Sequence, residues 1–293
     1  MRGLCLLGAV TGLLGSGAPA TRAPQSGPVP VDTASDAEVL RESRRLGAEL
    51  SAIFMAVERA VSEGVTTKHL NDVAVREILA RGLVPYFKGF VGYPAETTIA
   101  VNDEIINSVP SERRLQRGDL VKVQIGVRSE RAYALRGWTF SVGRPSDRDA
   151  ALIETARRAL SAAVAKVRIG AHTGDVSSTL KNVVEAAGFR VSPYWVGHGI
   201  GRSPWVAPEI PALGEAGTGA PFAADAVYSI SVIVHAGSPE ARVSYPDGWT
   251  AFAADHARSV HFTQMVTPTA NGPEELIPPP LAGKVAPVPA AEP

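Results

Sequence analysis

The chain lacks three features that would each indicate a particular class of protein. Cys5 is its only cysteine and lies in the first twenty residues, so the rest of the chain has no disulfide and no thiol chemistry. Neither sign of charge is in excess, because 29 Lys and Arg residues stand against 29 Asp and Glu residues, without a long run of one sign. We therefore expect no nucleic-acid partner and no electrostatic attraction to an anionic membrane.

A hydrophobic run long enough to cross a bilayer is the third missing feature. The longest N-terminal apolar stretch runs from Gly3 to Leu14, which is too short to span a membrane. Arg2 precedes it and Ala18-Pro19-Ala20 follows, a pattern typical of a cleavable export signal over residues 1–20. With such a signal the protein would be secreted or periplasmic. As an Ala/Gly-rich extension without that role, the same segment would leave the protein in the cytoplasm, and the cysteine usage fits either compartment.

Segments rich in Pro and Ala flank the part of the chain that can fold. Residues 21–34 are predicted to be a linker and residues 278–293 a disordered tail that begins with Pro278-Pro279-Pro280. The chain is 45% hydrophobic and 20% charged, a composition that supports a sizeable core. A single folded domain is therefore predicted over residues 35–277.

Helix signals open this domain. Ser35-Asp36-Ala37-Glu38 is a capping-box pattern, and apolar residues recur after it at helical spacing as far as Gly64. A second helix is predicted to begin after Thr67 and to stop at Gly82. Three segments of strand character follow, at 97–101, 120–127 and 138–142.

The same order of elements then repeats. A long helix is predicted from Ser146-Asp147, and strands return at 226–234, 249–253 and 260–267. The residues that begin and end the second helix recur 106 positions later. Gly170, Thr173 and Gly188 correspond to Gly64, Thr67 and Gly82. Coincidence between common capping residues is the alternative explanation. Two copies predict an α+β domain with helices on one face of a curved, mainly antiparallel sheet and a site between the halves.

Several motifs in a fixed order carry a family resemblance. They are Gly197-His198-Gly199-Ile200-Gly201, Val101-Asn102-Asp103-Glu104, Gly118-Asp119-Leu120-Val121, Asp247-Gly248-Trp249-Thr250 and Asn271-Gly272-Pro273-Glu274-Glu275-Leu276. With this set the chain resembles the methionine aminopeptidases and their creatinase-like relatives from about residue 36 to 277. The resemblance implies the pita-bread fold, built from two pseudo-symmetric halves, and places the chain among metallopeptidases.

The resemblance also implies where metal ligands would lie. Active members hold two divalent ions with two Asp, one His and two Glu. Carried over in order, these positions fall at Gln124, Leu135, His198, Ser231 and Thr263, so only the histidine is present. Two further histidine positions of the family, near the substrate, fall at Asn107 and Trp205.

An error of register could hide true ligands, but nearby acids do not restore the site. Side chains alternate along a strand, so a substitute must lie an even number of residues away. Asp119 is five residues from Gln124, and Glu130 is five from Leu135. Asp255 lies eight residues before Thr263 and is expected beyond that strand. We therefore expect no bound metal and no other cofactor.

Three functions compete on this basis. The leading hypothesis is a catalytically inactive homologue that binds a peptide, small ligand or protein in a neutral cleft. The first alternative is an active enzyme: a methionine aminopeptidase-type metallopeptidase with ligands elsewhere, or a metal-independent hydrolase in which His198 is the only catalytic candidate. The second is an interaction protein using its outer surface. The predicted cleft comprises Asn107, Gln124, Leu135, His198, Trp205, Ser231 and Thr263.

Aromatic residues cluster near these positions in the sequence. Trp205, Tyr228 and Phe262 fall on or beside the expected pocket, and Trp195 and Trp249 lie close to it. They would either stack on a planar or apolar ligand or fill the core.

Overall fold

A computed structural model describes residues 36–243 and 246–278 of the chain. The predicted export signal, the linker and all of the predicted tail beyond Pro278 lie outside the described residues. Within the described ranges, no helix combines the length and the apolar character needed to cross a membrane.

The first half begins with two helices, α1 (Asp36–Ala60) and α2 (Thr67–Ala80). Thr66 caps α2, because its side chain accepts a hydrogen bond from the backbone N–H of His69. The remaining elements are β1 (Val84–Pro85), the 3-10 turn η1 (Phe90–Gly92), β2 (Thr97–Val101), β3 (Glu104–Ile106), β4 (Leu120–Arg128) and β5 (Tyr133–Ser141).

The second half repeats this order with α3 (Asp147–Val164) and α4 (Thr173–Ala186). Helices α2 and α4 each have 14 residues and begin at corresponding threonines, which confirms the predicted repeat of the second helix. Strands follow as β6 (Arg190–Val191), β7 (Gly197–Ile200), β8 (Val206–Ile210), β9 (Val227–His235), β10 (Ala241–Val243), β11 (Ala251–Ala253), β12 (Ser259–Thr269) and β13 (Gly272–Glu275).

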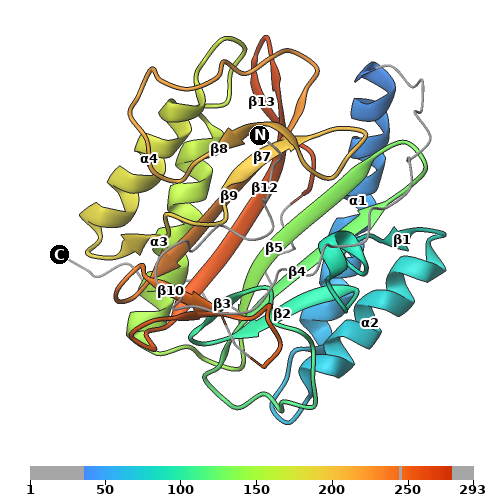
Figure 1. Cartoon of the computed structure of the whole chain (residues 1–293), viewed down its shortest axis with the longest axis vertical. Coiled ribbons are helices and arrows are strands. Elements are labelled where there is room, and N and C mark those ends of the chain that lie inside the picture. Colours follow the sequence, from blue (N-terminus) through green and yellow to red (C-terminus); the bar gives the residue numbers. More distant parts are fainter. Residues whose placement is uncertain (1–35, 244–245, 279–293) are drawn as a thin grey trace, which may run out of the picture.

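Every strand pair within the described ranges is antiparallel. One sheet has the order β1-β4-β2 with β5 on β4, and another has β13-β12-β9-β7-β8 with β6 on β9. A third sheet, β10-β11-β3, joins segments of both halves. The two large sheets meet where β5 runs beside β12, near the centre of Figure 1.

Threonine hydroxyls bridge β5 and β12. The Thr139 hydroxyl donates to the carbonyl of His261 and accepts from the N–H of the same residue, both at 2.9 Å. The N–H of Gly137 donates to Oγ1 of Thr263 at 2.7 Å. Threonine side chains therefore make hydrogen bonds here that backbone groups make elsewhere in the sheets. We call this boundary between β5 and β12 the seam between the halves, and the candidate site lies at it.

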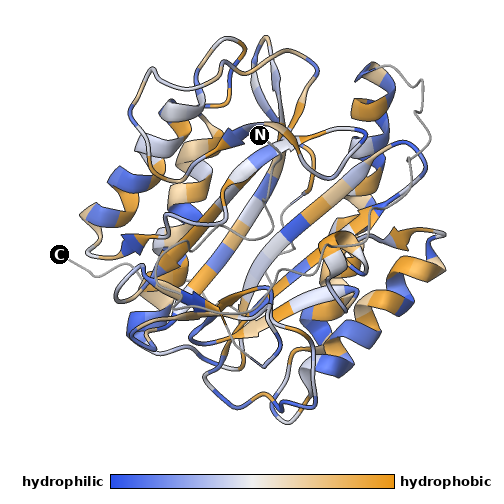
Figure 2. Cartoon of the chain, viewed as in Figure 1, coloured by the Kyte–Doolittle hydropathy of each residue, from blue (hydrophilic) through white to orange (hydrophobic). Residues whose placement is uncertain are grey.

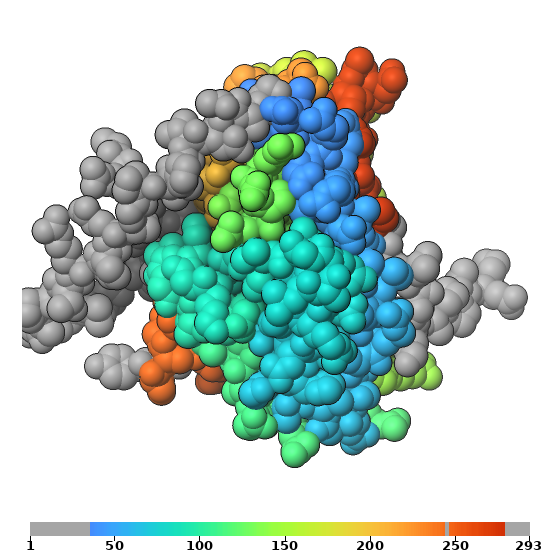
Figure 3. All heavy atoms as spheres, turned by 90° about the vertical axis from the view of Figure 1, so that its right-hand side faces the viewer, coloured from blue at the N-terminus to red at the C-terminus, as the bar shows by residue number. Residues whose placement is uncertain are grey.

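Helices cover one face of the strands, and the cores lie between the two layers. One buried cluster lies under α1 and α2 and includes Leu46 and Phe54, while a second under α3 and α4 includes Leu160 and Leu180. Hydrophilic and hydrophobic residues alternate along α2 and α4 (Figure 2), as expected for helices with one solvated face. Figure 3 shows α1 and α2 filling the side of the molecule that the first half builds. The predicted α+β pita-bread fold is confirmed.

The end of the described chain is held between α1 and the sheet. The carbonyl of Pro278 accepts from Nη1 of Arg136 at 2.7 Å and from the Ser51 hydroxyl at 3.1 Å. Arg136 is fully buried, with its guanidinium 4.3 Å from the ring of Trp138. Gly47 lies where a Cβ atom would collide with the carbonyl of Leu276, which accounts for a glycine inside α1.

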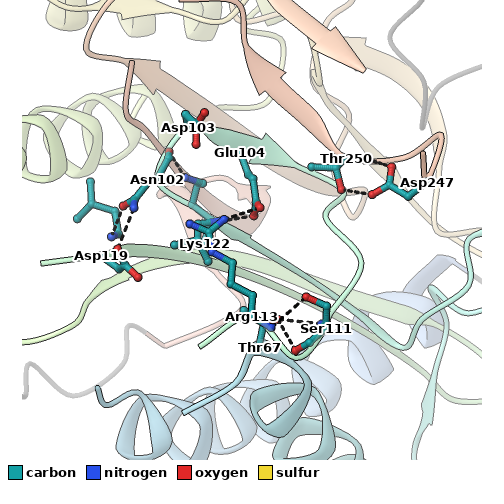
Figure 4. Close-up of polar contacts among 12 residues, drawn as sticks. Thr67, Asn102, Asp103, Glu104, Ser111, Arg113, Asp119, Lys122, Asp247 and Thr250 are labelled. Atoms are coloured by element: carbon teal, nitrogen blue, oxygen red, sulfur yellow. Dashed lines mark hydrogen bonds and ion pairs between the residues drawn. The ribbon is translucent and has the colours of Figure 1, made fainter. Parts of the chain in front are cut away.

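Some boundaries differ from the predictions. Strand β5 begins at Tyr133 rather than 138, and β11 begins at Ala251 rather than 249. The later start of β11 has a local cause, because the Asp247 carboxylate closes a turn there. It accepts from the N–H group of Trp249 and from that of Thr250, whose contact with Asp247 is drawn in Figure 4.

Candidate functional site

A cavity of about 40 Å³ lies at the seam between the two halves. Strands β3, β4, β5, β7, β9 and β12 each contribute side chains to it, and the residues just after β3 and just before β7 and β8 contribute the rest. All seven residues of the predicted cleft line this cavity. Among the described residues, the lining comprises Ile106, Asn107, Gln124, Leu135, Trp195, Val196, His198, Trp205, Ser229, Ser231, His261 and Thr263.

Strand pairing fixes the relative positions of the polar groups. Thr263 on β12 lies directly opposite Ser231 on β9, and Gln124 on β4 lies opposite Gly137 on β5. The Thr263 hydroxyl accepts from the backbone of Gly137, and Oε1 of Gln124 lies 3.5 Å from the Thr98 hydroxyl. Thr263 and Gln124 are therefore held by protein partners as well as lining the cavity.

His198 is presented by the glycine-rich strand β7. A Cβ atom on Gly197 would lie 2.5 Å from the carbonyl of Ser229, and one on Gly199 would lie 2.6 Å from the carbonyl of Ala207. Only glycine permits such close approach of β7 to its neighbours. The glycines thus bring the His198 imidazole into the seam.

The ring of His198 has one fixed tautomer in its neutral form. Its Nδ1 lies 3.0 Å from the carbonyl of Gly199. Since a carbonyl oxygen can only accept, Nδ1 carries the hydrogen and Nε2 keeps a lone pair. The ring stacks on Trp205 with 3.8 Å between centroids. Burial lowers the pKa of His198 to about 4, so the ring is neutral at pH 7.

His261 is a second histidine in the cavity and was not among the predicted site residues. It is 2% exposed, and its Nε2 lies 3.2 Å from Oγ of Ser231. Burial, reinforced by the charge of Lys122, lowers its pKa to about 3. A signal was available in the sequence, because His261 is two residues from Thr263 and side chains on a strand share a face at that spacing.

Two lining residues have strained backbones. Asn107 has φ 59° and Trp195 has φ 55°, both in the left-handed region. This conformation is uncommon for a bulky residue such as tryptophan, and such strain concentrates at functional sites. The indole N–H of Trp195 is buried and has no hydrogen-bond partner among the described residues.

Only two of the five aromatic residues near the predicted pocket line it. Trp195 and Trp205 do so, whereas Tyr228 and Phe262 point to the opposite face of β9 and β12, within the core beneath α3 and α4. Trp249 packs edge-on against Tyr93, with 5.2 Å between ring centroids. Of the two roles expected for these aromatic residues, Tyr228 and Phe262 fill the core, because strand alternation turns their side chains away from the pocket.

The donor set at the seam does not fit a two-ion metal centre. The five carried-over positions offer one imidazole, two hydroxyls, one amide and an apolar side chain, whereas hard divalent ions need anionic oxygens. Within residues 36–243 and 246–278 no group of three or more His, Cys, Asp or Glu side chains could hold a metal ion.

The three acids rejected as substitute ligands lie elsewhere in the structure. Asp119 accepts from the Asn102 amide (Figure 4) and from the N–H of Gln116, both at 2.8 Å. Asp255 accepts from the N–H groups of Ser238 and Ala257 in a turn before β12, and Glu130 is exposed. None of these three acids lines the cavity.

Comparisons with known proteins agree with this architecture. The family model of metallopeptidase family M24 matches residues 41–270. The methionine aminopeptidase of Clostridium perfringens is 34% identical over 233 residues, which are 80% of this chain and 93% of that protein. The crystal structure of methionine aminopeptidase from Thermotoga maritima is similar with a TM-score of 0.80 at 30% identity, covering 82% of this chain and 96% of that one. Prolidase from Pyrococcus furiosus shares the fold, with a TM-score of 0.64 at 18% identity.

Proposed function

The chain belongs to metallopeptidase family M24, and from this premise we propose that it is a ligand-binding homologue of the methionine aminopeptidases without their metal-dependent activity. The observation that carries the proposal is the convergence of all five carried-over ligand positions on one cavity whose described lining has no Asp, Glu, Lys or Arg. The cleft binds a peptide, a small molecule or a segment of a partner protein instead.

Electrostatic repulsion and desolvation explain why carboxylates are absent from all four positions together. Carboxylates crowded in a half-buried cavity without a cation raise one another's pKa, and each uncompensated ion costs several kcal/mol of desolvation. Gln124, Ser231 and Thr263 replace such groups with neutral polar side chains, and Leu135 replaces one with an apolar side chain. A pocket that no longer holds metal gains stability from all four changes.

Features of the cavity also support a retained role in binding. Asn107 and Trp195 remain in strained left-handed conformations at its wall. Trp205 stacks on His198 and presents a flat surface. Residues that only filled volume would not need such strain, which the surrounding structure must stabilise.

An active methionine aminopeptidase is the second candidate. It is favoured by the similarity to the enzyme of Clostridium perfringens, 93% of whose length is matched at 34% identity. This candidate requires metal ligands other than the residues of the described cavity. A metal-independent hydrolase using His198 would need a nucleophile or an activated water beside Nε2 of that ring.

Metal content and turnover of the full-length chain separate these candidates. The purified protein is incubated in turn with cobalt, manganese, iron and zinc ions, desalted and analysed for bound metal, and release of methionine from a Met-Ala-Ser peptide is measured with each ion. We expect metal at background and no turnover. Two retained ions per chain together with ion-dependent release would overturn the proposal. Metal-independent release that is lost in His198→Ala would support the hydrolase instead.

A further inference from the structure

Two polar groups in the cavity have opposite hydrogen-bonding roles. Oε1 of Gln124 lies beside the Thr98 hydroxyl at 3.5 Å, so the –NH2 end of the amide is the end that can donate to a ligand. Nδ1 of His198 donates to the carbonyl of Gly199, so its Nε2 is an acceptor. The cavity therefore offers a donor from β4 and an acceptor from β7.

The cavity also lacks a counter-ion for a charged ligand. Of the described residues that line it, none is acidic or basic. Lys122 lies on the same face of β4 as Gln124, but it does not line the cavity and its amine donates to the carbonyls of Asn102 and Ser259. An ammonium or carboxylate bound here would be buried unpaired, at a cost of several kcal/mol.

The size of the cavity limits the group that enters it. A volume of about 40 Å³ holds about three water molecules. A planar group of three or four heavy atoms fits such a space beside the stacked rings of His198 and Trp205, which are 3.8 Å apart. A carboxamide has that size and shape, and its carbonyl oxygen and N–H complement one donor and one acceptor.

We infer that the cleft recognises an uncharged carboxamide group of a blocked peptide or amide ligand, with Gln124 donating to its carbonyl oxygen and His198 accepting from its N–H. The inference rests on the proposed function, because a two-ion centre would occupy the same space. It differs from recognition of a free N-terminal ammonium, for which the described lining provides no acidic partner.

Calorimetric titration of the full-length chain with three methionine derivatives, which differ in whether each end is blocked or charged, tests this inference. The probes are N-acetylmethionine amide, which is uncharged, methionine amide, which carries an ammonium, and N-acetylmethionine, which carries a carboxylate. We expect the uncharged probe to bind at least about tenfold tighter than either charged probe, a difference of about 1.4 kcal/mol.

Variants assign the two contacts. Gln124→Met keeps the length of the side chain but removes the donor, and His198→Phe keeps the stacking but removes the acceptor. Each should weaken binding of the uncharged probe about tenfold, while Gln116→Met and His69→Phe, which alter exposed residues outside the cavity, should leave it unchanged. Gln124→Glu should shift the preference toward methionine amide, because it supplies the missing anion.

Failure of the inference can be told from failure of the proposed function. Equal or tighter binding of a charged probe, abolished by the cavity variants, would overturn the carboxamide specificity and leave the binding cleft standing. Absence of binding for all three probes in a folded wild-type chain would also overturn the specificity. The proposed function itself is decided by the separate metal measurement.

Discussion

The buried amine of Lys122 donates a 3.0 Å hydrogen bond to the backbone carbonyl of Ser259, 137 positions further along the chain. The same Nζ donates to the carbonyl of Asn102 at 2.7 Å (Figure 4). Lys122 thus links β4 of the first half to the first residue of β12 in the second. Burial lowers its pKa to about 7, against a partial opposing effect from Glu104. A neutral amine keeps two N–H groups, which suffice for the two carbonyls.

This depressed pKa predicts an alkaline rise in stability. The unfolded chain keeps Lys122 protonated up to its ordinary pKa of 10.5, while the folded chain releases the proton near 7. Between these values the unfolded state binds more protons, so the free energy of unfolding increases with pH, by up to about 3 kcal/mol between pH 7 and 9. Urea unfolding at pH 7, 8 and 9 should show this rise in the wild type and its loss in Lys122→Met. Lys181→Met, at an exposed position, should keep it, and an unchanged slope in Lys122→Met would contradict the assignment.

His235 predicts a loss of stability in acid. It is fully buried, and neither ring nitrogen has a hydrogen-bond partner among the described residues. Burial lowers its pKa from 6.5 to about 4, so the unfolded state protonates first as the pH falls. Stability should therefore decrease from pH 6.5 towards pH 4, with up to about 3 kcal/mol due to this residue.

His235→Leu removes the titrating ring and should reduce this acid loss in urea unfolding curves at pH 7, 5.5 and 4.5. Burial also lowers the pKa values of His198 and His261, so these two residues should still contribute to the loss of stability in acid. His69→Leu, which alters an exposed histidine, is the control and should follow the wild type. If His235→Leu also followed the wild type, the ring would have to be protonated in the native state.

Restoring four carboxylates should restore metal binding. The variant combines Gln124→Asp, Leu135→Asp, Ser231→Glu and Thr263→Glu. Since Ser231 and Thr263 are directly opposite on neighbouring strands, the two new Glu side chains would repel each other without metal. We expect a lower melting temperature than the wild type in chelator and a rise on addition of manganese or cobalt ions, which should not stabilise the wild type. A metal response equal in both chains would show that the carried-over positions are not the ligand positions.

Local sequence patterns predicted the helices. The short strands and the buried polar residues depend on contacts between segments distant in sequence, so they could not be predicted in this way. The caps and glycines around α2 and α4 act within a few residues, so their boundaries were readable 106 positions apart. Strands of two or three residues, such as β1, β6 and β10, exist only through their partners and carry no periodicity of their own. The fully buried Arg136 would have been placed at a surface on composition alone.

The residues of the candidate site could be predicted only from the register of this sequence with the family's ligand positions. The seven residues that the register places at the predicted cleft line one cavity, but the register could not show the left-handed backbones of Asn107 and Trp195, which depend on their surroundings. It also passed over His261, which is not a ligand position of the family. Strand alternation alone would have placed His261 beside Thr263.

His261 has a place in the seam because Gly137 has no side chain. A Cβ atom on Gly137 would lie 2.7 Å from Cε1 of the His261 ring. Gly137→Ala should therefore destabilise the protein by about 1–3 kcal/mol through overpacking. In a His261→Ala background, the same substitution should cost much less, because the ring is gone. Urea unfolding of the two single variants and the double variant measures this coupling.

Gly126→Ala is the matched control, because its new Cβ would meet the ring of Tyr86 on the same sheet rather than His261. Its cost should be the same with and without His261. Equal costs for Gly137→Ala in both backgrounds would mean that the backbone of β5, and not the imidazole, limits the site. A reduced cost confined to Gly137 would place the His261 ring against β5, where it reaches Ser231 and forms one wall of the neutral cleft.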